Sequence, residues 1–189
     1  NAVLPDRPTE PEHEVRAWND HSEDERRLFA RYKETYAAMV DNIDQNLGRL
    51  RAHLEMLGEW DNTIVLFTSD NGASREGQTM GTAAYFRTLL GAARNTDEDF
   101  HQADLAQIDQ IGGPQTMPHY PRGWAMASNT PFRLYKVNAH HGGHQVPMVL
   151  SWPAGKVEPG IRHVYQHVTD VMATLAELAR RYWGSDTQT

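Results

Sequence analysis

The stretch Thr63-Ile-Val-Leu-Phe-Thr-Ser-Asp-Asn-Gly72 constrains the fold more than any other part of this chain. Its apolar and β-branched residues predict a buried strand over residues 63–69, which runs directly into an Asp-Asn pair and a glycine turn. Ligands of open α/β sheets collect outside the carboxyl ends of strands, so Asp70 and Asn71 are candidate ligands for a hard metal ion. The alternative is an ordinary strand that ends in an Asx turn, because Asp, Asn and Gly are common turn residues.

A second informative segment covers residues 129–153. It contains Lys136, then His140-His-Gly-Gly-His144, and then a run that predicts a second strand over residues 146–152. The double glycine permits a close approach of backbone segments or a positive φ. Lys136 is a point charge on a flexible stem, and His140 can gain or lose a proton near neutral pH. The alternatives are structural: a solvated surface lysine and a hydrogen-bonded turn histidine.

Together, these segments resemble the sulfatase family, specifically the bacterial arylsulfatase branch of the alkaline-phosphatase-like superfamily. The resemblance extends through residues 120–128 and 162–170, so it spans most of the chain. It implies an α/β fold, a partial alkaline-phosphatase-like domain whose sheet strands are flanked by helices. It also implies site roles. Asp70 and Asn71 would bind a divalent cation, more readily Ca²⁺ than Mg²⁺; Lys136 would contact the sulfate; and His140 would orient it or protonate the leaving oxygen.

The chain departs from the family in the residues that would carry the nucleophile. Sulfatases oxidise the Cys or Ser of a Cys/Ser-x-Pro-x-Arg motif to formylglycine, and a pair of aspartates near the N-terminus adds metal ligands. This chain has no cysteine, no Ser-x-Pro-x-Arg and no Asp-Asp pair, and Asn129-Thr-Pro-Phe-Arg133 offers only an amide. The resemblance therefore implies the later portion of a catalytic domain, with the N-terminal half and the formylglycine outside the chain. We expect the isolated chain to be inactive.

A long amphipathic helix is predicted over about residues 22–58. Ser22 and Glu25 can form a capping box at its start, and apolar residues recur at steps of three and four as far as Leu57. Gly58 follows, where a left-handed residue can end a helix. An apolar stripe of this length needs a larger sheet to cover it, which again suggests strands outside the chain.

A long excursion, residues 72–145, separates the first strand from the second. Loops of this length are usually functional or disordered. Because Tyr120 and Trp124 fall near the expected site, we favour a folded wall on the substrate side. The alternative is a peripheral insertion packed by its own side chains. A final helix is predicted over about residues 168–182, and residues 1–189 are expected to form a single partial catalytic domain.

Composition limits the class of partner. The formal net charge of −7 argues against nucleic-acid or membrane-surface partners, for which a basic stripe is expected. The absence of cysteine excludes disulfides and thiolate metal sites. No signal peptide is visible, and the location stays open between cytoplasm and periplasm. The expected partners are a sulfate-ester substrate and the rest of a sulfatase chain.

Other functions stay open at this point. A phosphatase or phosphonate-ester hydrolase of the same superfamily needs a similar clamp for its oxyanion, and a non-catalytic metal-binding or interaction module needs no nucleophile at all. On a smaller scale, His140, His141 and His144 are close enough in sequence to suggest a zinc site, although no cysteine completes it.

Overall fold

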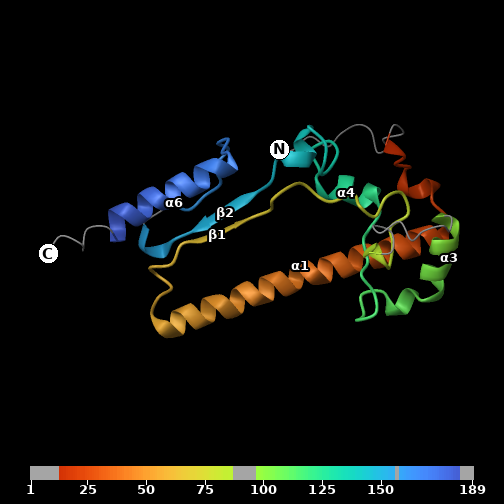
Figure 1. Ribbon diagram of the computed structural model, residues 1–189, viewed down its shortest axis with the longest axis horizontal. Coiled ribbons are helices and arrows are strands. Elements are labelled where there is room, and N and C mark those ends of the chain that lie inside the picture. The colour runs from red at the N-terminus through yellow and green to blue at the C-terminus, as the bar shows by residue number, and fades with distance from the viewer. Residues whose placement is uncertain (1–12, 87–96, 156–157, 184–189) are drawn as a thin grey trace. The chain divides into compact units, whose positions relative to one another are not determined.

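The computed structural model describes residues 13–86, 97–155 and 158–183 of the chain. The chain divides into two compact units, Asn1–Gly155 and Lys156–Thr189, and each is described by itself. The first unit contains, in chain order (Figure 1), η2 (Trp18–Asp20), α1 (Glu23–Leu57), β1 (Val65–Thr68), α3 (Asp97–Ala106), η3 (Ile108–Gln110), α4 (Arg122–Ser128), α5 (His141–His144), β2 (Met148–Ser151) and η4 (Pro153–Gly155). The second unit contains α6 (Val168–Trp183).

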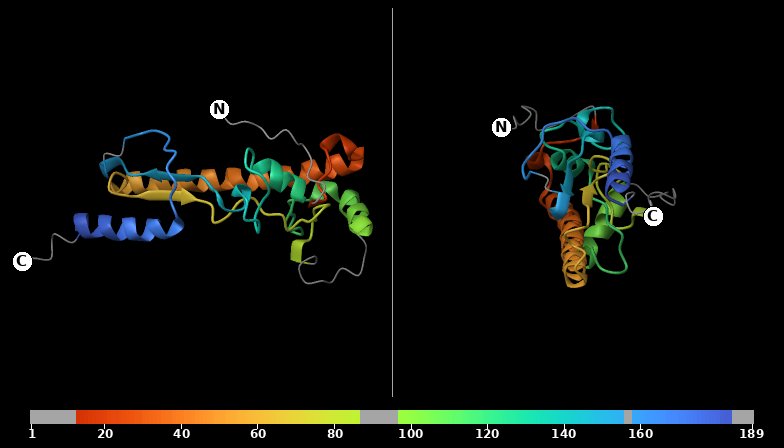
Figure 2. Two further views of the ribbon diagram at one scale, coloured as in Figure 1. Left: turned by 90° about the horizontal axis from the view of Figure 1, so that it is seen from above. Right: turned by 90° about the vertical axis from the view of Figure 1, so that its left-hand side faces the viewer.

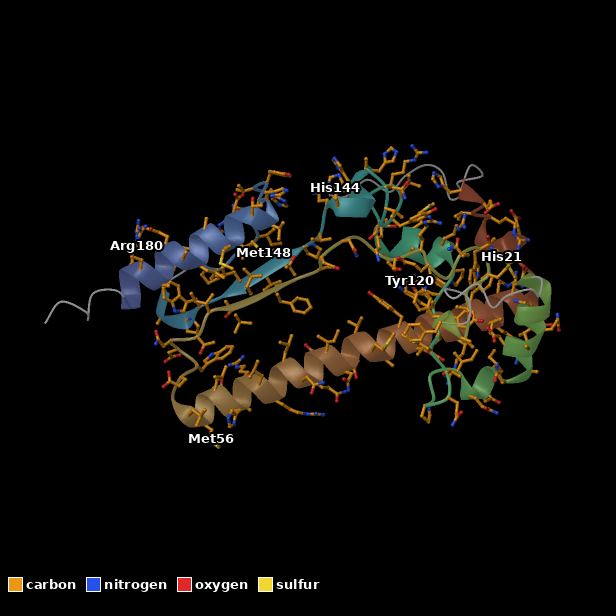
Figure 3. All side chains as sticks on the ribbon, in the orientation of Figure 1. His21, Met56, Tyr120, His144, Met148 and Arg180 are labelled. Atoms are coloured by element: carbon orange, nitrogen blue, oxygen red, sulfur yellow. The ribbon has the colours of Figure 1, made fainter. Side chains whose placement is uncertain are left out.

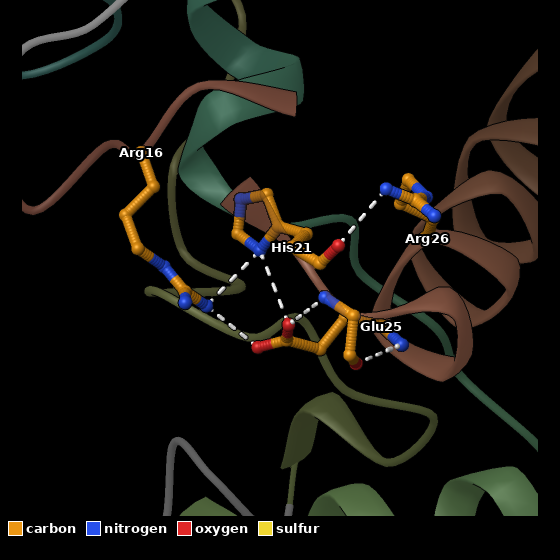
Figure 4. A network of polar contacts seen from close by, with 5 residues as sticks. Arg16, His21, Glu25 and Arg26 are labelled. Carbon is orange, nitrogen blue, oxygen red and sulfur yellow. Dashed lines mark hydrogen bonds and ion pairs between the residues drawn. The ribbon is translucent and has the colours of Figure 1, made fainter. Parts of the chain in front are cut away.

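Helix α1 begins and ends at the capping residues that the sequence suggests. The Ser22 hydroxyl accepts a hydrogen bond from the backbone N–H of Glu25 at 3.1 Å, and the Glu25 carboxylate accepts one from the backbone N–H of Ser22 at 2.7 Å. Arg16 donates to the other Glu25 oxygen at 2.6 Å (Figure 4). Gly58 ends the helix in the left-handed conformation, with φ of 75°. Local chemistry therefore defines both ends of this 35-residue helix.

The hydrophobic core lies where the first turns of α1 meet the excursion. Its buried members are Leu28, Phe29, Tyr32, Ala83, Ile111, Tyr120, Ala125, Leu134 and Tyr135. A buried polar contact joins the same parts of the chain. The Tyr32 hydroxyl donates to an Asp104 carboxylate oxygen at 2.5 Å, and the same oxygen accepts the backbone N–H of Ala83 at 2.7 Å. Because a buried carboxylate needs hydrogen-bond partners, this contact fixes α3 against α1.

The aromatic side chains of the excursion hold it to α1. Tyr120 is 5% exposed and packs edge-on against Tyr36, with the ring centroids 5.1 Å apart. The indole N–H of Trp124 donates to the backbone carbonyl of Phe29 at 3.0 Å. The Tyr120 ring is therefore part of the core and not of an exposed surface, and the folded wall on the substrate side stays a prediction.

Strands β1 and β2 pair antiparallel and lie side by side, with Val65 opposite Ser151 and Thr68 opposite Met148 (Figure 2). The sequence predicts that residues 63–69 are buried, but Phe67 is 47% exposed. The expectation of burial is wrong for this strand. A sheet of two strands, which is the whole sheet in the described part of the chain, cannot bury both of its faces.

The second half of α1 carries its apolar stripe on the surface. Large apolar side chains exposed on this part of the helix are Met39, Val40, Ile43, Leu50, Met56 and Leu57. Met56 reaches 73% exposure, and Met148 on β2 is 42% exposed (Figure 3). Folded proteins normally cover stripes of this length, so the uncovered stripe and the small sheet agree with a partial mixed α/β domain.

The second unit is organised around α6. At the start of this helix, the Asp170 carboxylate accepts a hydrogen bond from the backbone N–H of His167 at 2.9 Å, so the acid serves the helix N-terminus. None of the helices in the described ranges has both the length and the apolar character that crossing a membrane requires.

Candidate functional site

The tip of β1 carries Asp70 and Asn71 into a turn that packs against the double glycine. Asp70 is exposed and Asn71 is half-buried. The backbone N–H of Gly72 donates to the carbonyl of Gly143 at 3.0 Å. A Cβ at Gly72 would lie 1.7 Å from the carbonyl oxygen of Gly142, so only glycine permits this approach. The sequence pattern Asp-Asn-Gly thus meets the pattern Gly-Gly through direct backbone contact.

Lys136 reaches the same turn from the other segment. Its backbone N–H donates to the carbonyl of Ala73 at 3.0 Å, which places the lysine beside the residues that follow Asn71. Leu134 and Val137, on either side of it, have positive φ angles of 65° and 71°. A β-branched residue such as Val137 adopts this conformation only at an energetic cost, and such strain concentrates at functional sites.

The side chain of Lys136 forms an ion pair with Glu76. The ammonium lies 2.8 Å from one Glu76 oxygen. The hydrogen bond with Glu76 raises the pKa of Lys136 above its ordinary value, and the negative charges of Glu76 and Asp70 raise this pKa further. Burial raises the pKa of Glu76, but the hydrogen bond from Lys136, a backbone hydrogen bond and the nearby charges of Lys136 and His119 together outweigh burial, so the net pKa of Glu76 lies below its ordinary value. The observed geometry is therefore a Lys136–Glu76 ion pair beside the turn that follows Asp70 and Asn71.

His119 lies beside Glu76, and the sequence alone does not predict it as a residue of this site. Its Nε2 is 2.9 Å from the Ser74 hydroxyl and 3.7 Å from the second Glu76 oxygen. Its Nδ1 accepts the backbone N–H of Gly77 at 3.1 Å when that nitrogen is unprotonated. Glu76 could have been suspected as a carboxylate close after Asp-Asn-Gly, but nothing local in the sequence places His119 beside this turn.

Asn129 holds the two segments of the site together. Its side-chain oxygen accepts the backbone N–H of Ala73 at 3.0 Å, and its side-chain nitrogen donates to the carbonyl of Leu134 at 2.9 Å. The amide that stands in the Asn-Thr-Pro-Phe-Arg segment is thus engaged at both ends. It acts as a structural clamp.

Asp70 and Asn71 fit part of a site for a hard divalent cation. The Asn71 nitrogen donates to the carbonyl of Gly72 at 3.1 Å, which leaves the amide oxygen as the atom free to act as a ligand. Ca²⁺ takes six to eight oxygen ligands. The described residues contain no group of three or more His, Cys, Asp or Glu side chains arranged for a metal ion. A cation at this turn would therefore need further oxygens from elsewhere.

The three histidines that the sequence places close together, His140, His141 and His144, do not all contact one another or the rest of the site in the described residues. His140 is exposed at the N-cap of α5, and its side chain makes no hydrogen bond or ion pair to Asp70, Asn71 or Lys136 among the described contacts. His141 and His144 stack edge-on with ring centroids 5.6 Å apart. The zinc alternative finds no support in the described ranges, which hold no three-ligand group of that kind.

A family comparison matches the Sulfatase profile to residues 4–181, nearly the whole chain. The chain belongs to the sulfatase family. An uncharacterized sulfatase of Schizosaccharomyces pombe is 31% identical over 165 residues, which cover 87% of this chain and 28% of that protein. The arylsulfatase of Klebsiella aerogenes is 29% identical over 167 residues, which cover 86% of this chain and 32% of that protein.

A shorter similarity concerns a different kind of relative. The multifunctional alkaline phosphatase superfamily protein PehA of Trinickia caryophylli is 47% identical over 38 residues, 20% of this chain and 7% of that protein. The two sulfatases that match most of this chain are much longer than the chain. The matched residues cover 28% of the Schizosaccharomyces pombe protein and 32% of the Klebsiella aerogenes arylsulfatase, so this sulfatase chain spans about a third or less of their length.

Proposed function

We propose that this chain is the later part of an enzyme that hydrolyses sulfate esters, and specifically of an arylsulfatase. The observation that carries the proposal is the backbone contact between the two segments: the Gly72 N–H donates to the Gly143 carbonyl, and the Lys136 N–H donates to the Ala73 carbonyl, each at 3.0 Å. Family membership supports the reaction class, and the similarity to an arylsulfatase supports the aryl ester as substrate.

In this proposal, Lys136 binds an oxygen of the sulfate. An ammonium has three N–H donors, so Lys136 can keep its bond to Glu76 and still donate to an anion. Negative charge develops on the sulfate oxygens and the leaving oxygen during hydrolysis, and a fixed cation stabilises it. In the same proposal, His140, at the N-cap of α5, donates a proton to the leaving oxygen, because an imidazole can act as a general acid near neutral pH.

The charge balance favours a divalent cation at Asp70 and Asn71. Two carboxylates, Asp70 and Glu76, act on the single charge of Lys136. A cation held on Asp70 would offset one of these negative charges where the sulfate is proposed to lie. Asp70 and the Asn71 oxygen would hold that cation, and Ca²⁺ suits this oxygen set and an incomplete, flexible ligand shell better than Mg²⁺. When bound, the cation polarises the sulfate.

The nucleophile and the remaining metal ligands would lie outside this chain. The side chain of Asn129 is engaged in structural hydrogen bonds, and an amide cannot be oxidised to the aldehyde. The exposed apolar stripe of α1 offers a surface on which further strands could pack. We propose that the chain completes its site with an N-terminal portion that supplies the formylglycine.

The test is steady-state hydrolysis of 4-nitrophenyl sulfate by the isolated chain and by the longer protein that carries it. We expect the longer protein to be active, EDTA to abolish the activity, and Lys136→Ala or Asp70→Asn to lower kcat/KM about 100-fold or more. The control is Lys33→Ala, which removes a lysine held over the Tyr36 ring at 4.2 Å on α1. Lys136-dependent turnover by the isolated chain would show that the nucleophile does not lie outside it.

A phosphatase or phosphonate-ester hydrolase is the second candidate, favoured by the similarity to the alkaline phosphatase superfamily protein. Sulfate and phosphate groups need similar clamps, but a phosphate monoester carries more negative charge. Comparing kcat/KM for 4-nitrophenyl sulfate and 4-nitrophenyl phosphate separates the two functions. A longer protein that binds Ca²⁺ through Asp70 yet hydrolyses neither ester would instead be a non-catalytic metal-binding module.

A further inference from the structure

We propose that Glu76 is a positioning residue for Lys136: it holds the lysine ammonium at the tip of β1 in the direction that meets an incoming sulfate. The inference rests on the proposed role of Lys136 as the sulfate contact. The supporting juxtaposition is the 2.8 Å ion pair between Glu76 and Lys136 at the turn that carries Asp70.

Lys136 needs such a partner because its own stem does not define its direction. A lysine ammonium sits on a flexible four-carbon chain with many rotamers. The backbone of Lys136 is fixed, through the 3.0 Å hydrogen bond to Ala73, but its side chain is 37% exposed. Among the contacts of the described residues, the ion pair with Glu76 is the one that restricts the ammonium. It occupies one N–H donor and leaves two for an anion.

Glu76 is itself held in place, which makes it a suitable anchor. Its side chain is 29% exposed, and its second oxygen is buried without a hydrogen bond. That oxygen lies 3.7 Å from His119 Nε2, which also contacts the Ser74 hydroxyl at 2.9 Å. The backbone N–H of Gly77, the residue after Glu76, points at the other ring nitrogen of His119 at 3.1 Å. The His119 ring thus supports the turn on both sides of Glu76.

The chain offers a direct way to observe this lysine, because it contains only three lysines: Lys33, Lys136 and Lys156. Lysine side chains labelled with ¹³C at Cε give separate NMR signals, and Lys136→Arg identifies the signal of Lys136. The order of the Cε methylene reports how tightly the ammonium is held. Titration with inorganic sulfate, with Ca²⁺ present and at constant ionic strength, reports the affinity. Lys33 serves as an internal reference.

We expect Glu76→Gln to lower the order of the Lys136 methylene and to raise the sulfate concentration at half-saturation roughly two- to fivefold, since partly exposed ion pairs are modest in strength. The Lys33 signal should not change. The matched control is Glu55→Gln, which removes an equally short 2.8 Å pair with Arg51 on α1. Thermal unfolding of each variant verifies that it folds.

The outcomes separate the two proposals. If Lys136 of the unmodified chain responds to sulfate, and Glu76→Gln changes neither its order nor its titration, the positioning role of Glu76 is wrong while the function of Lys136 stands. If the Lys136 signal of the unmodified chain does not respond to sulfate, the proposed function of Lys136 fails, and the inference about Glu76 fails with it. A drop in Lys136 order together with weaker sulfate binding supports both.

Discussion

The side-chain oxygen of Asn129 accepts the backbone N–H of Ala73 at 3.0 Å. This bond connects residues 56 positions apart and joins the turn after β1 to the segment that carries Lys136. The spacing of Asn129 mimics a nucleophile motif in the sequence, yet the residue serves to align the two halves of the site.

Asn129→Ala should destabilise the chain by about 1–3 kcal/mol, because it leaves the Ala73 N–H and the Leu134 carbonyl without their partners. Urea unfolding measures this difference. The control is Asn46→Ala, which removes exposed side-chain hydrogen bonds within α1 and should change stability by no more than about 0.5 kcal/mol. Equal effects of the two substitutions would argue against the clamp.

Tyr32→Phe should destabilise the chain by about 1–3 kcal/mol, because the buried Asp104 carboxylate loses the hydroxyl that lies 2.5 Å away. Burial and the Asp104 contact both raise the pKa of Tyr32, so the hydroxyl keeps its proton at neutral pH. Tyr36→Phe, which preserves the ring that packs on Tyr120, is the matched control. Thermal unfolding that ranks the Tyr36 variant as the less stable would contradict this account.

Gly142→Ala should destabilise the chain by about 1–3 kcal/mol, because the new Cβ would lie 2.2 Å from the Leu134 carbonyl oxygen and force the turn open. Gly48→Ala is the control: it is the same substitution, but it should stabilise the chain. No atom lies within 4 Å of a Cβ at Gly48, so alanine in this helix should stabilise by about 0.5–1 kcal/mol. Chemical denaturation of the two variants should therefore shift in opposite directions.

Stability should fall in acid partly through Glu25. Burial raises the pKa of Glu25, but the hydrogen bond from Ser22 N–H and the contact with Arg16 outweigh burial, and the net pKa is lower in the folded chain than its ordinary value of 4.5. A lowered folded pKa means that the contribution is present above the unfolded pKa and is lost as the pH falls through the folded value.

Glu25→Gln should therefore lower the free energy of unfolding at neutral pH. As the pH falls below 4.5, the free energy of unfolding of this variant should decline less steeply than that of the unmodified chain. Unfolding free energies measured from neutral pH downward provide the test. Glu59→Gln, which changes an exposed carboxylate just beyond α1, should keep the steeper decline. A Glu25 variant with the same acid dependence as the unmodified chain would rule out this contribution.

Features with local causes could be predicted from the order of the residues alone. Ser22 and Glu25 cap α1 because their groups lie within one helical turn, and Gly58 ends it because only glycine readily adopts φ of 75°. The run of β-branched residues before Asp70 predicted a strand that ends at the candidate ligands, and motif order indicated the sulfatase family, which the family comparison confirms.

Which distant residues share the site became clear only from the folded chain. The pairing of Glu76 with Lys136, the support from His119 across 45 positions to Ser74, and the clamp at Asn129 depend on how the excursion folds back on β1. The exposure of β1 could not be predicted from its residues either, because burial depends on what covers a strand and not on its composition. The difference lies in the sequence separation of the interacting groups. Caps and turns are stabilised by residues a few positions away, whereas ion pairs and buried faces form between distant chain segments, and no local pattern predicts which segments meet.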